Sequence, residues 1–153
     1  MPLMITSGHW DAAMATAVAV TLCVLLHYEV LDFLDRLMVR IHAHWRRPRL
    51  LVLMFCLILL HILEIWVFGI GYWWLGTEAD RGMIEVLQGA SAGLPDYVYF
   101  SAVIYTTLGL GDMIPHGPMR FMVGTEALTG FLLVTWSASF TFMEMERWWR
   151  RRG

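Results

Sequence analysis

Three long runs of hydrophobic residues alternate with polar segments along the chain, and their lengths predict its main elements. The runs cover residues 12–28, 50–75 and 119–144. An α-helix of about 17 to 25 apolar residues can cross the hydrocarbon core of a bilayer. We therefore expect three transmembrane helices, of which the first is close to the lower limit of length.

A different pattern follows the first run, where apolar residues recur at helical spacing and charged residues occupy the opposite face. The apolar positions are Leu34, Leu37 or Met38, Ile41 and Trp45. This pattern predicts an amphipathic helix over residues 31–45 that lies at the membrane interface. Pro48 is expected to end it, because proline interrupts helices.

Between the second and third runs lies a shorter, aromatic-rich amphipathic segment. Pro95 and Asp96 are typical of a helix start, with Asp96 as the cap. The helix expected over residues 96–106 is too short to cross a bilayer, so we interpret it as re-entrant. The run Thr106-Thr-Leu-Gly-Leu-Gly-Asp112 follows it directly.

The alternate glycines of this run indicate a specific chemistry. Glycine accepts positive φ values that other residues resist, so a short segment can turn its carbonyls to one side. Repeated around one axis, such carbonyls can replace the water around a dehydrated cation. The pattern predicts an all-α integral membrane protein with three transmembrane helices, a re-entrant pore helix and a selectivity-filter loop in a pore formed by several copies of the chain.

Composition supports a membrane protein: 58% of the residues are hydrophobic, and 8 are tryptophan. So small a chain cannot hide this much apolar surface from water, so lipid must solvate part of it. Cys23 and Cys56 lie within apolar runs, and their spacing indicates neither a disulfide framework nor a metal site.

Charge predicts the orientation. All eleven basic residues are arginine, and nine of them fall within residues 36–49 and 147–152. Positive residues remain on the cytoplasmic side, so we expect a cytoplasmic C-terminus, an external N-terminus and an external segment 76–118 in a multi-pass protein of the cell (inner) membrane. Carboxylates that would attract cations there are Glu78, Asp80, Glu85, Asp96 and Asp112.

The segment Tyr99-Phe-Ser-Ala-Val-Ile-Tyr-Thr-Thr-Leu-Gly-Leu-Gly-Asp-Met-Ile-Pro115, followed by Arg120 and Gly130, resembles the pore module of bacterial two-transmembrane potassium channels. The resemblance covers residues 50–146, as outer helix, pore helix, filter and inner helix. It implies four subunits around a K⁺ pathway, with K⁺ as the bound ion and no other cofactor.

The resemblance also implies roles by position. The filter would comprise Thr107, Leu108, Gly109, Leu110 and Gly111, with K⁺ bound at the first four positions and the Thr107 hydroxyl innermost. Asp112 would tie the filter to the pore helix, and Gly130 would be the gating hinge. Thr106 and Glu126 are further candidates for filter support. From the residues themselves, Gly130 is equally a small residue for helix packing.

Two features depart from the family. Leu110 stands where an aromatic residue is usual, although leucine occurs there in some two-pore potassium channel domains. The bracing ring is missing, which makes a weakly selective monovalent cation channel the nearest alternative. The other departure is the additional N-terminal segment, residues 12–45.

The inner helix supplies further candidates. Helical spacing from Gly130 suggests that Phe131, Val134, Ala138 and Phe142 face the cavity, with Phe142 as the inner constriction and Glu146 near the inner mouth. Glu126 lies one turn before Gly130. A buried carboxylate needs partners, so we expect a hydrogen bond to Thr106, Tyr105 or nearby backbone; alternatively, its protonation tunes filter stability.

Ionisable residues at membrane depth are functional candidates. His61 and Glu64 lie three residues apart on one helical face. They could form a metal or proton-sensing site with His27, but mutual hydrogen bonding, or bonding to a neighbouring helix, is favoured. The arginines at 36–49 are irregularly spaced in a polar loop, which favours an interfacial anchor over a voltage sensor.

The chain divides into an N-terminal helical segment 1–49, a pore domain 50–146 and a basic tail 147–153. It has one pore segment, so a homotetramer in the lipid bilayer is the simplest assembly. We expect a potassium channel, with a non-conducting regulatory subunit as an alternative of another class. The sequence shows no nucleophile–base or paired-aspartate pattern, so enzymatic activity is not expected, and neither is nucleic-acid binding.

Overall fold

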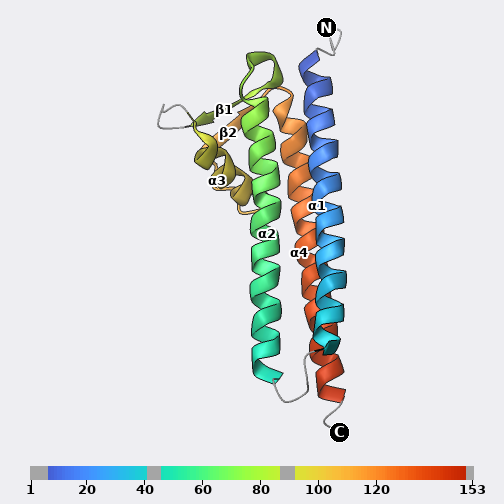
Figure 1. Ribbon diagram of the computed structural model, residues 1–153. Helices are drawn as coiled ribbons and strands as arrows, with labels where there is room; N and C mark the ends of the chain where they lie inside the picture. The colour runs from blue at the N-terminus through green and yellow to red at the C-terminus, as the bar shows by residue number, and fades with distance from the viewer. Residues whose placement is uncertain (1–6, 41–45, 87–91, 151–153) are drawn as a thin grey trace.

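The computed structural model describes residues 7–40, 46–86 and 92–150. Its four α-helices are α1 (Ser7–Arg40), α2 (Arg46–Leu75), α3 (Leu94–Tyr105) and α4 (Met119–Arg150). A 3₁₀ turn (Ala79–Arg81) and the strands β1 (Met83–Val86) and β2 (Met113–His116) complete it. In Figure 1, α1, α2 and α4 run side by side, and α3 with the two strands lies beside one end of α2. Because α1, α2 and α4 are long and apolar enough to cross a bilayer, the chain is a multi-pass, all-α membrane protein.

The first helix is longer than predicted. α1 is continuous from Ser7 to Arg40, so the prediction of a separate amphipathic helix after residue 28 is wrong. Asp32 and Arg36, one turn apart on α1, form an ion pair that suits a continuous helix. The apolar residues of this segment pack within the bundle in a buried cluster that comprises Leu31, Leu34, Leu53, Leu57, Leu60 and Phe140. Ile41 and Trp45 lie outside the described residues.

Pro48 does not end a helix but lies in the first turn of α2, which begins at Arg46. Proline is tolerated there because the first amides of a helix have no intrahelical acceptor. The third apolar run likewise forms a longer helix than expected, since α4 extends to Arg150.

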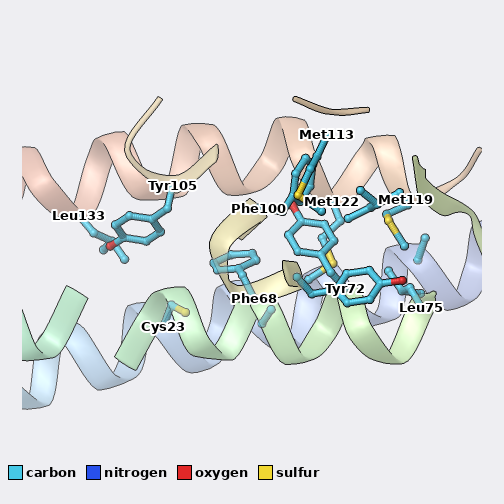
Figure 2. Packing of buried hydrophobic residues seen from close by; sticks show 14 residues of the cluster. Cys23, Phe68, Tyr72, Leu75, Phe100, Tyr105, Met113, Met119, Met122 and Leu133 are labelled. Atoms are coloured by element: carbon cyan, nitrogen blue, oxygen red, sulfur yellow. The ribbon is translucent and has the colours of Figure 1, made fainter. Parts of the chain in front are cut away.

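A hydrophobic cluster fixes α3 against the half of the bundle that contains the start of α1 (the upper half in Figure 1). Figure 2 shows its aromatic and methionine side chains between the helices, among them Phe68, Tyr72, Phe100, Met119 and Met122. The rings of Tyr72 and Phe100 meet edge to face at 5.2 Å. Gly69 brings the α2 backbone close to α3, since a Cβ there would meet Val98 at 2.8 Å.

Two short strands that were not predicted join the segments before and after the pore helix. β1 and β2 are antiparallel, with Met83 opposite His116 and Val86 opposite Met113. His116 and Glu85 also pair across the strands, with 3.0 Å between Nε2 and Oε2. The pairing closes the chain around α3 and the segment that follows it.

Ion pairs join the helices at both ends of the bundle. Near the N-terminus, Arg81 donates to Asp11 of α1 at 2.8 Å and lies 4.4 Å above the Trp74 ring. At the opposite end, Glu144 of α4 accepts from Arg49 of α2 at 2.6 Å and from Arg147 at 2.7 Å. Charged groups therefore tie α1 to the 3₁₀ turn at one end of the bundle and α2 to α4 at the other.

Candidate ion-conduction site

The pore helix begins two residues earlier than predicted. Gly93 is the N-cap of α3, and the Asp96 carboxylate accepts a hydrogen bond from the Gly93 N–H at 2.7 Å. Asp96 therefore does cap the helix, from its third position, where a carboxylate also favours the positive end of the helix dipole. With 12 residues, α3 is about 18 Å long, which is shorter than the hydrocarbon core.

Backbone hydrogen bonds guide the chain out of α3 into the predicted filter. The Thr107 N–H donates to Ile104 O at 2.9 Å, and the Leu108 N–H donates to Val103 O at 2.9 Å. The Thr106 hydroxyl donates to Ala102 O at 2.7 Å. These contacts satisfy carbonyls at the end of the helix and turn the first filter amides back toward α3.

Positive φ angles recur at every second residue of the predicted filter. The values are 58° at Thr107, 58° at Gly109 and 78° at Gly111. A Cβ at Gly109 or Gly111 would meet nothing within 4 Å, so backbone conformation and not crowding explains these glycines. Thr107 takes the same conformation despite its branched side chain, which is uncommon.

Asp112 links the end of this segment to the middle of the pore helix. Its carboxylate accepts a hydrogen bond from the Tyr99 hydroxyl at 2.8 Å. That bond raises the pKa of Tyr99, because the carboxylate favours the protonated phenol. The contact joins the predicted filter segment to α3; the role of Asp112 in a filter stays a prediction.

Within one chain, the filter segment lies on an open face. Residues 106–111 are all exposed, and the side chains of Leu108 and Leu110 retain 63% and 57% of their accessible surface. The packing of a single chain thus leaves this backbone accessible, where other molecules can surround it.

Glu126 is buried behind the pore helix, but its partners differ from those predicted. Its two carboxylate oxygens accept hydrogen bonds from Ser101 of α3 and Tyr72 of α2, each at 2.5 Å. The prediction that Glu126 bonds to Thr106 or Tyr105 is therefore wrong. Glu126 therefore joins α4 to both α3 and α2, which fixes the pore helix from behind.

Gly130 lies where α4 crosses the end of the pore helix. A Cβ at this position would overlap the carbonyl of Tyr105, the last residue of α3, and would approach its ring at 3.0 Å. The structure thus gives Gly130 a packing role at the base of the filter segment. Its role as a gating hinge stays a prediction.

A second polar cluster joins all four helices below α3. The Nδ1 atom of His27 lies 2.9 Å from Glu64 Oε1, and the Nδ1 atom of His61 lies 3.0 Å from Glu64 Oε2. Tyr105 donates to Glu64 Oε2, and Ser137 of α4 lies 3.1 Å from His61 Nε2. Hydrogen bonding between His61, Glu64 and a neighbouring helix is confirmed; the roles of Tyr105 and Ser137 were not predicted.

The buried and exposed faces of α4 separate the predicted cavity residues from the packing residues. Leu133, Ser137, Phe140 and Glu144 are buried within the chain. The positions predicted to line the cavity are all exposed: Phe131, Val134, Ala138 and Phe142. Glu146 is intermediate in exposure. Pore lining stays a prediction, and the packing of one chain leaves these side chains available for it.

Comparison with known proteins identifies the class. Residues 49–147 match a family model described as an ion channel. The match spans well over half of the 153 residues, so the chain belongs to this ion-channel family. No match was found among curated proteins or among solved structures.

Proposed function

We propose that four copies of this chain form a potassium-selective channel that conducts K⁺ passively across the cell membrane. The observation that carries the proposal is the recurrence of positive φ at Thr107, Gly109 and Gly111 directly after a helix too short to cross the bilayer. Alternating left- and right-handed residues turn successive carbonyls toward one side of a strand. Stacked rings of such oxygens can replace the hydration shell of K⁺.

The exposed filter supports a fourfold assembly. Backbone at membrane depth must be enclosed by protein or face water, yet residues 106–111 are exposed in one chain. Four chains around one axis would enclose these residues and give the K⁺ ligands at Thr107, Leu108, Gly109 and Leu110. The exposed Phe131 and Phe142 of α4 would then face the cavity below the filter.

The charge distribution supports a cation as the conducted ion and a cytoplasmic position for the C-terminus. The C-terminal end of α3 leads into the filter, so the negative end of its dipole would favour a cation there. Arg49 and Arg147 lie at the same end of the bundle, where both contact Glu144. Placing that end in the cytoplasm follows the positive-inside rule and puts the N-terminus outside.

Ion flux from liposomes tests the proposal. We expect purified wild-type protein to pass K⁺ and Rb⁺ but little Na⁺. Gly109→Ala should abolish the K⁺ flux, because alanine resists the φ of +58° at this position. Gly124→Ala is the matched control, since its Cβ would meet nothing within 4 Å at a helical position. Equal loss of flux in both variants would contradict the assigned filter.

One observation favours a second candidate, a weakly selective monovalent cation channel. Leu110 places an exposed aliphatic side chain where the resemblance leads one to expect a bracing aromatic ring. Measurement of reversal potentials under bi-ionic K⁺ and Na⁺ conditions separates the two candidates. A permeability ratio near one would support the weakly selective channel. Absence of any cation flux from correctly folded protein would instead support a non-conducting regulatory subunit.

A further inference from the structure

The polar cluster below the pore helix has the composition of a metal site. His27, His61 and Glu64 each offer one ligand atom, and these three atoms lie within 4.8 Å of one another. The side chains of His27 and Glu64 are fully buried, and that of His61 is 18% exposed. Imidazole and carboxylate together are common ligands of Zn²⁺ and neighbouring transition metals. An ion could reach the cluster past His61, because the side chain of His61 is the only one of these three that is partly exposed.

The spacing of the ligand atoms is close to that of a coordination shell. Bonds of about 2.0–2.1 Å in a tetrahedral Zn²⁺ site place neighbouring ligand atoms roughly 3.3–3.4 Å apart. The separations from the two Nδ1 atoms to the Glu64 oxygens are 2.9 Å and 3.0 Å. Small side-chain movements would therefore admit an ion between these groups, with Tyr105 or water at the fourth position.

Ser137 supplies the outer contact that metal-binding histidines need. Its Oγ lies 3.1 Å from His61 Nε2 and 3.4 Å from His27 Nε2. Both imidazoles thus direct Nδ1 toward Glu64 and Nε2 toward the same hydroxyl. A hydroxyl oxygen has two lone pairs and can accept from both N–H groups. On metal binding, the proton of each ring would move from Nδ1, where it faces the Glu64 carboxylate, to Nε2, where Ser137 can accept it. Both Nδ1 lone pairs would then face the metal, held in place by the Ser137 contact.

We propose that His27, His61 and Glu64 bind one divalent transition-metal ion per chain, with Zn²⁺ as the best match. Tyr105 donates to Glu64 Oε2, so an ion on that oxygen competes with the Tyr105 hydroxyl. Tyr105 is the last residue of α3 and directly precedes Thr106. Metal occupancy would therefore alter the support of the filter and change ion flux; this consequence rests on the proposed channel function, whereas binding itself does not.

Metal binding is tested on the purified full chain after removal of any affinity tag. Equilibrium dialysis against buffered Zn²⁺, with metal analysis, should give one tightly bound ion per wild-type chain. His27→Ala and Glu64→Gln should each weaken this binding at least tenfold. His116→Ala is the matched control, because His116 is exposed and pairs with Glu85 on the strands. Retained binding in His27→Ala and Glu64→Gln, or its loss in His116→Ala, would overturn the proposal.

A measurement on the wild type covers the case in which a variant fails to fold. X-ray absorption of the Zn²⁺-loaded protein should show two imidazoles and a carboxylate around the metal; a shell of oxygen ligands without imidazole would overturn the site. Adding Zn²⁺ to liposomes should change wild-type flux and leave His27→Ala flux unchanged. Zinc bound at these residues in a chain without flux would contradict the channel function but support the site. A conducting chain that binds no zinc would contradict the site alone.

Discussion

At the residue scale, Gly130 illustrates how the absence of a side chain lets the pore helix pack closely against α4. The backbone of α4 approaches the Tyr105 carbonyl so closely that a methyl group would overlap it. Gly124, less than two turns earlier on the same helix, has open space around its Cβ position. The two glycines therefore allow packing to be separated from general helix flexibility.

Gly130→Ala should destabilise the protein, because α3 must shift to admit the new methyl group. Overpacking of this kind costs about 1–3 kcal/mol. Gly124→Ala should be neutral or slightly stabilising, since alanine is the better helix former by roughly 1 kcal/mol. Thermal unfolding in detergent, followed by tryptophan fluorescence, measures both. If Gly130→Ala melts like the wild type and instead alters channel opening, the hinge interpretation is the correct one.

The sequence was sufficient to predict the backbone conformation of some residues of the site, but not the contacts of others. The spacing of Gly109 and Gly111 predicted the backbone conformation, because glycine is selected for φ values that few other residues adopt. The partners of Glu126 could not be predicted in the same way. Ser101 and Tyr72 lie 25 and 54 residues away, so their contact depends on how α2, α3 and α4 pack.

At the scale of elements, the three long helices follow from apolar runs that are long enough to cross a bilayer. The boundaries were less predictable. The amphipathic pattern after residue 28 is compatible with a surface helix and with a helix that continues into the bundle. Leu34 and Met38 are buried in the structure, so tertiary packing decided between the two. β1 and β2 have four residues each, too few to give a distinct alternation, and are stabilised by pairing across 26 intervening residues.

Charged contacts between elements should contribute unequally to stability. Glu144 of α4 is 2% exposed and binds Arg49 of α2 and Arg147. Glu144→Gln keeps the shape but removes the charge. We expect a loss of about 2 kcal/mol, below the roughly 3–5 kcal/mol for a fully buried pair, because the Arg49 side chain is 27% exposed. Asp32→Asn, in the exposed pair with Arg36, should cost under about 0.5 kcal/mol.

The comparison of these two variants is made by thermal unfolding under identical detergent and salt conditions. A clearly lower transition temperature for Glu144→Gln than for Asp32→Asn would show that the buried charge of Glu144 helps to hold α2 and α4 together at this end. Equal transitions would mean that the apolar contacts between the helices suffice without the buried charge.

At the scale of the whole molecule, a single chain leaves its chemically most specific segment uncovered. The filter residues and one face of α4 are exposed, while the opposite face of α4 packs against α1 and α2 through Leu133, Ser137 and Phe140. Lipid can cover the apolar faces but cannot satisfy filter carbonyls. The proposed closure by identical chains around an axis would satisfy both requirements.

If four chains hold potassium as proposed, the ion should stabilise the assembly. An ion that binds the closed filter and not the separated chain shifts the equilibrium toward the tetramer. Four chains of 17.6 kDa have a protein mass of about 70 kDa, which native mass spectrometry measures. Replacing Na⁺ by K⁺ should raise the temperature at which this species dissociates. Gly109→Ala should retain the mass and lose most of the K⁺ effect, because its Cβ meets no neighbour but resists the required φ. A species of one chain in K⁺ would contradict the shared pore, whereas a tetramer indifferent to K⁺ would contradict the ion sites within it.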